Sequence, residues 1–190
     1  MNRELTENKV FEKITFTENN FLSGVYEECR FQNCDGKKAD FSGITFRSCS
    51  FDGCDLSLAL FRNSVLQDVK FLNSKLLGVQ FSECRNFLLQ LDFQNCMLKL
   101  ALFSKLKLKN TRFKNCDLQE VDFTDADLAE SIFEHCDLLL ATFFKTNLEK
   151  ADFRSALNYS INPETNRISK ASFSIPAVIG LLDKYNIEIE

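Results

Sequence analysis

The chain has 190 residues, 45% of them hydrophobic, which is typical of one domain with a sizeable core and excludes a disordered chain. Its charge is mildly acidic, with 27 Asp and Glu against 23 Lys and Arg, so a surface built to neutralise phosphates is not expected. The aromatic residues are 20 Phe, 3 Tyr and no Trp, and side chains without a polar tip belong in a core.

The N-terminal segment, MNRELTENKVF, lacks the charged-then-apolar layout of a signal peptide. No apolar run in the chain approaches the roughly 20 residues that a membrane span requires. We therefore expect a cytoplasmic protein that makes no contact with a membrane.

From Phe11 onward, large apolar residues recur every five positions. Neither the helix period of about 3.6 nor the strand period of about 2 gives five, so each unit combines a short extended piece with a corner, and the chain coils. Because Phe and Leu alternate from Phe51, we expect four units per coil, with Phe on two opposite walls and Leu on the others. Gly36 is the one gap in the first series, which comprises Phe11, Phe16, Phe21, Tyr26, Phe31, Phe41, Phe46, Phe51, Leu56, Phe61, Leu66, Phe71, Leu76 and Phe81.

A second series is out of register with the first, because Phe81 and Phe93 are twelve residues apart where two units need ten. If Leu88 is the missing wall residue, the alternation continues and this coil carries two extra residues. We predict a two-residue bulge within residues 82–88, at Arg85 and Asn86; a break between two stacked half-solenoids is the alternative. The second series is the predicted structural core: Phe93, Leu98, Phe103, Leu108, Phe113, Leu118, Phe123, Leu128, Phe133, Leu138, Phe143, Leu148 and Phe153.

Each unit has a small residue two positions before its large residue, and often Asp or Asn directly before it, as in Ala126, Asp127 and Leu128. Small and large residues that point inward would fill a narrow interior, and short polar side chains suit the corners. This pattern resembles the pentapeptide-repeat family from about Phe11 to Phe153. The resemblance implies an all-β solenoid, a right-handed quadrilateral β-helix of about eight coils with a spacing of about 4.8 Å.

All eight cysteines occupy the small-residue position of the grid: Cys29, Cys34, Cys49, Cys54, Cys84, Cys96, Cys116 and Cys136. We interpret them as small buried hydrophobic residues and free thiols, because parallel Cβ vectors and a reducing cytoplasm disfavour disulfides. A redox role for Cys84 beside the bulge is the alternative. Zinc would need CxxC pairs or several histidines, and His135 is the only histidine.

No catalytic arrangement stands out in the sequence. His135 lies at an outward position, and the six glycines are scattered rather than clustered in a phosphate-binding loop. Acidic residues are plentiful, but they follow the repeat, and a filled rod offers no cleft. We expect no enzymatic activity, no cofactor and no metal.

Charge is segregated in the second half, with a basic run before Cys116 and an acidic run from Asp117 to Asp137. Residues twenty apart should stack between coils, which predicts the ladders Lys105–Asp125–Lys145, Lys107–Asp127, Lys114–Glu134 and Glu130–Lys150. Four acids have no basic residue in this scheme: Asp117, Glu120, Asp122 and Asp137. They are the candidate partner-binding surface; a purely solvated set of charge ladders is the alternative.

The chain changes character at its C-terminus. We predict a repeat domain over residues 1–173 and, over residues 174–190, a helix and a short strand that cap the solenoid, since an open end would invite stacking. Ser174 suits a helix cap, Pro176 suits a first turn, and Ile187 and Ile189 alternate with glutamates. The expected dimer interface comprises Ile175, Val178, Ile179, Leu181, Leu182, Tyr185, Ile187 and Ile189.

This tail, together with CDLSLALF at Cys54 to Phe61, looks like those of the Qnr and MfpA types of quinolone-resistance protein within the family. That resemblance implies a homodimeric, DNA-mimicking rod that binds a type II topoisomerase, DNA gyrase or topoisomerase IV, and modulates it or protects it from quinolones. It implies no direct contact with nucleic acid. The alternative function is an interaction scaffold with an unrelated protein partner, because a fold alone does not fix a function.

Overall fold

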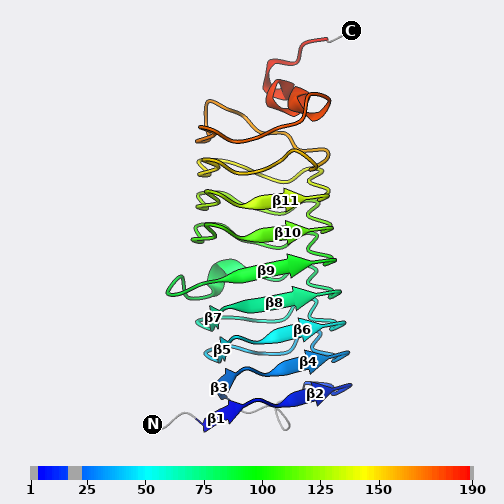
Figure 1. The fold of residues 1–190 in the computed structure, drawn as a ribbon, viewed down its shortest axis with the longest axis vertical. Helices are drawn as coiled ribbons and strands as arrows, with labels where there is room; N and C mark the ends of the chain where they lie inside the picture. Colours follow the sequence, from blue (N-terminus) through cyan, green and yellow to red (C-terminus); the bar gives the residue numbers. More distant parts are fainter. Residues whose placement is uncertain (1–3, 17–22, 189–190) are drawn as a thin grey trace.

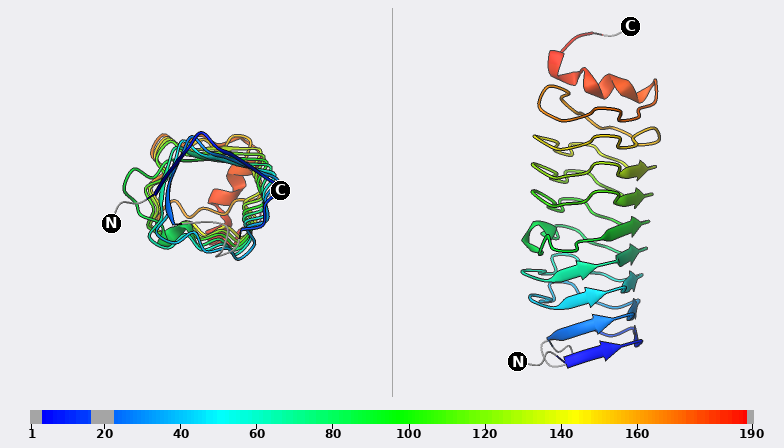
Figure 2. Two further views of the ribbon diagram at one scale, coloured as in Figure 1. Left: turned by 90° about the horizontal axis from the view of Figure 1, so that it is seen from below. Right: turned by 60° about the vertical axis from the view of Figure 1, so that its left-hand side comes forward.

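The computed structural model describes residues 4–16 and 23–188, so Phe21 and Ile189 lie outside the described part. The chain forms a parallel β-solenoid with its N-terminus at one end of a rod and its C-terminus at the other (Figure 1). Seen from below, the coils superpose in a roughly four-sided outline (Figure 2). The expected solenoid is confirmed, and the total of about eight coils stays a prediction.

Parallel strands stack into two sheets along neighbouring walls. One sheet has the order β1-β3-β5-β7, and the other has the order β11-β10-β9-β8-β6-β4-β2. Isolated bridges continue the stacking, as at Ile132, Asp152 and Ser172. The strands are β1 (Glu4–Glu7), β2 (Val10–Glu12), β3 (Gly24–Glu27), β4 (Arg30–Gln32), β5 (Thr45–Arg47), β6 (Ser50–Asp52), β7 (Val65–Gln67), β8 (Val69–Leu72), β9 (Leu91–Gln94), β10 (Arg112–Lys114) and β11 (Ile132–Glu134).

The interior is filled by aromatic rings. Phe113 stacks on Phe93 and on Phe133, with both pairs of ring centroids 5.1 Å apart. The Phe column of the opposite wall meets this one edge to face, as where the Phe103 and Phe113 rings lie 5.9 Å apart at 84°. Stacking within each column and edge-to-face contact between columns are both favourable ring geometries, so the rings leave no room for an internal cleft. The thirteen residues of the predicted second series are all at most 6% exposed.

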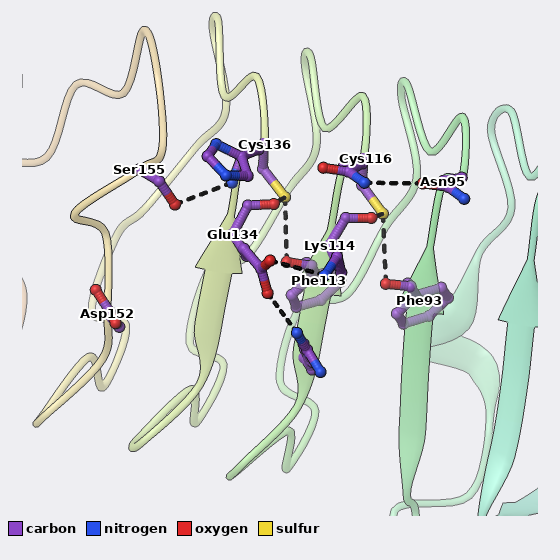
Figure 3. A network of polar contacts seen from close by, with 12 residues as sticks. Phe93, Asn95, Phe113, Lys114, Cys116, Glu134, Cys136, Asp152 and Ser155 are labelled. Atoms are coloured by element: carbon purple, nitrogen blue, oxygen red, sulfur yellow. Dashed lines mark hydrogen bonds and ion pairs between the residues drawn. The ribbon is translucent and has the colours of Figure 1, made fainter.

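The inward cysteines bond to the coil before them. The thiols of Cys116 and Cys136 donate to the carbonyl oxygens of Phe93 and Phe113, at 3.6 and 3.4 Å (Figure 3). All eight cysteines are free and buried. Burial raises the pKa of Cys49 and Cys54 to about 12, so both are protonated, unreactive thiols at neutral pH.

Corner residues adopt left-handed backbone conformations in coil after coil. Asn73, Asn95 and Asn115 have φ values of 49°, 54° and 51°, and asparagine tolerates this region well. Their side chains also bond to one another, because the Asn115 amide donates to Asn95 at 3.0 Å and the Asn95 amide donates to Asn73 at 2.9 Å. The repeat therefore alternates short extended pieces with tight corners.

The inserted residues form a projecting loop between β8 and β9, next to the short 3-10 helix η1 (Phe81–Glu83) (Figure 1). The stack continues across the insertion, because Phe71 pairs with Phe93, 22 residues on, and their rings stack at 5.3 Å. The alternative of two half-solenoids is therefore wrong. The assignment of Leu88 to the wall is also wrong: Leu88 is 53% exposed, and Leu89 is the leucine that packs against the core.

The C-terminal segment lies across the last coil. It forms two short 3-10 helices, η2 (Ala177–Leu181) and η3 (Asp183–Tyr185), where we expected one helix. The amide of Ile161 donates to the carbonyl oxygen of Gly180 at 2.9 Å, and a Cβ on Gly180 would collide with the Tyr159 carbonyl oxygen, so the segment docks through glycine. Ile187, the described part of the expected terminal strand, has no strand partner among residues 4–16 and 23–188. No helix in the described ranges has the length and apolarity of a membrane span.

Candidate interaction surface

The predicted acidic residues lie on the outer surface of neighbouring coils. Asp117 and Asp137 are bridge partners in one column, and Asp122 belongs to the next column, between Leu102 and Thr142. Each of the three carboxylates accepts a hydrogen bond from the backbone amide two residues later, at 2.8 to 3.1 Å. These bonds fix the turn, and all three aspartates are half-buried on the surface of the rod. Within residues 4–16 and 23–188, none of the three forms an ion pair.

Asp137 is the most strongly held of these carboxylates. Desolvation raises its pKa, but hydrogen bonds from the Asn158 amide at 2.8 Å and the Gln119 amide at 2.7 Å outweigh that effect. Its pKa therefore falls below the ordinary value, and Asp137 stays ionised well into the acidic range. Asp117 and Asp137 thus lie in register as two negative groups without a cationic partner among the described residues.

Glu120 does not belong to this unpaired set, and its prediction as an uncompensated acid is wrong. Its carboxylate lies 3.0 Å from the ammonium group of Lys99. The strict twenty-residue rule missed this pair because Lys99 and Glu120 are 21 residues apart and meet diagonally between coils. Long side chains reach diagonal neighbours on a sheet as well as directly opposed ones.

Two of the predicted charge ladders form. Glu134 lies between Lys114, at 2.9 Å, and Arg112, and hydrogen bonds from Arg112 and then Lys114 lower its pKa to about 2 (Figure 3). Glu130 lies 3.4 Å from both Lys109 and Lys150.

The other two ladders are wrong for the described residues. Asp125 has no ion pair with Lys105 or Lys145 there, and Asp127 accepts from the Asn147 amide at 2.7 Å in place of Lys107. Asp125 therefore adds a further unpaired, exposed acid beside Asp122. The acidic surface is defined here as Asp117, Asp122, Asp125 and Asp137.

The bulge residues Arg85 and Asn86 hold the projecting loop to its neighbours. The amide of Arg85 donates to the carbonyl oxygen of Ser64 at 2.9 Å, on the coil before. The Asn86 side chain donates to the Lys105 carbonyl at 3.0 Å and accepts from the Lys107 amide at 2.9 Å, on the coil after. The exposed tip of the loop is therefore Phe87, 71% exposed, and Leu88, neither of which the repeat pattern marked as a surface feature.

The C-terminal segment presents most of its predicted dimer residues to solvent. Ile175 is 88% exposed, and Val178, Ile179, Leu182, Tyr185 and Ile187 are between 38% and 56% exposed. A shallow groove among them is lined by Ile179, Leu182, Asp183, Asn186 and Ile187. Leu181 is only partly buried and packs against the core beneath the segment, and its place in an interface stays a prediction.

Three exposed leucines at one corner of the rod were not predicted from the sequence: Leu58, Leu100 and Leu140. The sequence does contain a signal for them. Each lies two residues after a wall leucine (Leu56, Leu98 or Leu138), a position at which the other leucine-centred repeats carry a polar residue or glycine.

The described residues contain no group of three His, Cys, Asp or Glu side chains placed to hold a metal ion. His135 faces outward on the corner after β11, and its backbone amide donates to Ser155 at 3.1 Å (Figure 3). The surface can therefore contact a partner through carboxylates and apolar side chains.

Comparison with known proteins gives matches to one family and one fold. Among solved structures, a trypsin-treated variant of QnrB1, a plasmid-mediated fluoroquinolone resistance protein, is 20% identical with a TM-score of 0.50, covering 96% of this chain and 99% of that chain. Full-length QnrB1 is 19% identical with a TM-score of 0.50, covering 97% and 100%. HetL, a pentapeptide repeat protein involved in heterocyst differentiation regulation from the cyanobacterium Nostoc, is 15% identical with a TM-score of 0.47, covering 90% and 86%. At these identities the likeness shows the fold alone.

Sequence comparison supplies the family. A search of curated proteins finds no match. The profile of the pentapeptide repeat region matches residues 25–103 and 44–123, and the profile of eight pentapeptide repeats matches residues 122–157. These matches cover the same five-residue grid on which the solenoid is built, and the chain belongs to the pentapeptide-repeat family.

Proposed function

We propose that this protein is a non-enzymatic, protein-binding rod that acts as a DNA mimic, binds a type II topoisomerase such as DNA gyrase, and modulates it or protects it from quinolones. The observation that carries the proposal is the acidic surface, whose carboxylates have no ion pair in the described ranges and lie outside a filled rod. Unpaired carboxylates on neighbouring coils present the kind of negative surface that a DNA-binding protein recognises. The resemblance to quinolone-resistance members of the family supports topoisomerase as the partner.

A second candidate function is an interaction scaffold with an unrelated partner. The charge ladders favour it, because Glu130 and Glu134 are each flanked by two basic side chains and so neutralise part of the rod. A strong DNA mimic would carry acids along a whole face. The two candidates differ in whether gyrase responds to the protein.

We further propose that two copies join end to end through the C-terminal segment. The exposed apolar side chains of that segment and the groove at Ile179 and Leu182 support this arrangement, because capping one coil end leaves an apolar side uncovered. Sedimentation of the wild type and of the variant I179D/L182D tests it. We expect a dimer for the wild type and a monomer for the variant at micromolar concentration, and a monomeric wild type would contradict the proposal.

The topoisomerase proposal is tested by gyrase supercoiling with and without a fluoroquinolone. Wild-type protein should inhibit supercoiling or reduce drug sensitivity. The variant D117N/D122N/D137N should lose this effect, because asparagine keeps the turn hydrogen bonds from the backbone amides and removes the charges.

A matched control is D35N/D40N, which changes two turn aspartates of the same columns near the N-terminus. This control should retain the effect. Unchanged supercoiling and unchanged drug sensitivity in the presence of micromolar wild-type protein would remove topoisomerase as the partner.

A further inference from the structure

Three leucines project from one corner of the rod into solvent. Leu58 is 48% exposed, Leu100 is 52% exposed and Leu140 is 71% exposed. They occupy the same position of the repeat, two residues after a buried wall leucine. Exposed leucines are unremarkable singly, but a repeated position forms a continuous feature. We name these three side chains the leucine ridge.

The fold does not require leucine at these positions. Leu58, Leu100 and Leu140 have φ values of 60°, 62° and 59°, a left-handed conformation that is unfavourable for a side chain with a Cβ. Other coils carry Gly78 or Glu120 at the same corner. Leucine there adds backbone strain and gains only partial burial, so the stability of the fold does not account for the ridge.

The ridge residues stand in line along the rod. The amide of Leu58 donates to the Leu77 carbonyl at 2.9 Å, and the amide of Leu100 donates to the Gln119 carbonyl at 3.1 Å, so each corner stacks on the next. Gly78, between Leu58 and Leu100, leaves the room that Leu58 uses, because a Cβ there would lie 2.9 Å from the Leu58 side chain. Successive ridge leucines are therefore two coils apart, roughly 9.6 Å at the strand spacing.

Negative charge flanks the ridge between Leu100 and Leu140 and at Leu140 itself, whereas Met97 and Leu102 flank Leu100 in its own coil. Asp117 and Asp137 lie in the outward column on one side, and Asp122 lies in the outward column on the other. None of the three has an ion pair in the part of the chain that the structure describes. Further apolar surface adjoins the ridge, since Met97 is 43% exposed and Leu139 is 44% exposed.

We propose that the leucine ridge binds an amphipathic α-helix of a partner protein, laid along the rod, with apolar side chains at every seventh position and Lys or Arg on either side. Seven helical residues advance about 10.5 Å, which matches the spacing of the ridge. The flanking aspartates complement basic residues beside the apolar stripe. A second copy of this chain is a poorer occupant, because a symmetric contact would bring the same aspartates against each other.

Binding is measured with a synthetic helical peptide of about three heptads, with leucine at every seventh position and lysine beside each leucine. The full-length protein should bind it with an affinity that falls as salt rises. A peptide of the same composition with leucine at every fifth position, which scatters the leucines around the helix, should bind far more weakly. Equal binding of the two peptides would overturn the proposal.

The decisive variant is L58N/L100N/L140N. Asparagine suits the left-handed corner, as at Asn73 and Asn115, so the melting temperature should be equal to or above that of the wild type. Loss of three half-exposed leucine contacts should weaken peptide binding on the order of 100-fold. The control L88N replaces an exposed leucine with a φ of 56° in the projecting loop, and it should bind as the wild type does.

The results for these variants distinguish a ridge that binds a helix from leucines that only support the fold. Unchanged peptide binding by L58N/L100N/L140N, or equal weakening by L88N, would overturn the proposal. A clear fall in melting temperature would also overturn it, because the leucines would then serve the fold. D117N/D122N/D137N should reduce the affinity roughly tenfold and reduce its salt dependence. The peptide assay contains no gyrase, so the topoisomerase proposal can fail while this one holds.

Discussion

The replacement Phe123→Ala tests the filled interior most sharply. The Phe123 ring is fully buried and stacks on the rings of Phe103 and Phe143, with centroids 5.4 and 5.2 Å away. It also meets Phe113 and Phe133 edge to face, at 5.9 and 6.0 Å. Truncation of a buried Phe costs about 3–5 kcal/mol, and four ring contacts favour the upper end of that range. We therefore expect a loss of about 5 kcal/mol in the free energy of unfolding.

The measurement is urea unfolding followed by circular dichroism, with Phe144→Ala as the control. Phe144 is adjacent to Phe143 in the same coil but points outward and is 44% exposed, so its truncation should cost about 1 kcal/mol. The exchange of Phe123 and Thr124, which moves the ring out of its column, should cost more than Phe123→Ala. A filled interior is refuted if Phe123→Ala unfolds within about 1 kcal/mol of the wild type, or if Phe144→Ala costs as much.

The packing, the thiols and the charge ladders each give a further prediction. Gly180→Ala should lower the free energy of unfolding by about 1–3 kcal/mol and expose the C-terminal segment to proteolysis, because the new Cβ would collide with the Tyr159 carbonyl oxygen. If the variant resists proteolysis as well as the wild type does, the segment does not dock in this way. The eight buried cysteines should resist alkylation near neutral pH in the folded protein and react once the protein is unfolded. Rapid labelling of the folded protein would show that reagents reach these thiols and that the interior is not filled. Arg112 and Lys114 lower the pKa of Glu134 from 4.5 to about 2, so the stability that the Glu134 carboxylate contributes is present above pH 4.5 and is lost as pH falls through 2. The difference in unfolding free energy between the wild type and Glu134→Gln should therefore shrink between pH 4.5 and pH 2. A difference that does not change with pH would contradict this prediction.

The solenoid was predictable from the sequence because its determinant is local. One large residue every five positions fixes both the corner and the inward side chain, so residues such as Phe113 and Phe123 could be placed without a structure. The insertion was less predictable. The segment FLLQL offers several apolar residues for one wall position, and only the three-dimensional stack distinguishes the buried Leu89 from the exposed Leu88.

The candidate surface was predictable only in part, because side-chain reach does not follow the strict twenty-residue rule. Glu120 meets Lys99 diagonally, and Asp127 prefers the amide of Asn147 to the ammonium group of Lys107. The C-terminal segment was also predictable only in part, since it forms two short 3-10 helices where the sequence pattern indicated one helix.

The central claim, that the acidic surface substitutes for DNA on a type II topoisomerase, is tested most directly by competition between this protein and a labelled DNA duplex for purified gyrase. We predict that wild-type protein displaces the duplex, and that D117N/D122N/D137N displaces it far less while D35N/D40N behaves as the wild type. A complex in which gyrase holds the duplex and the protein together, or no displacement at micromolar protein, would contradict the claim.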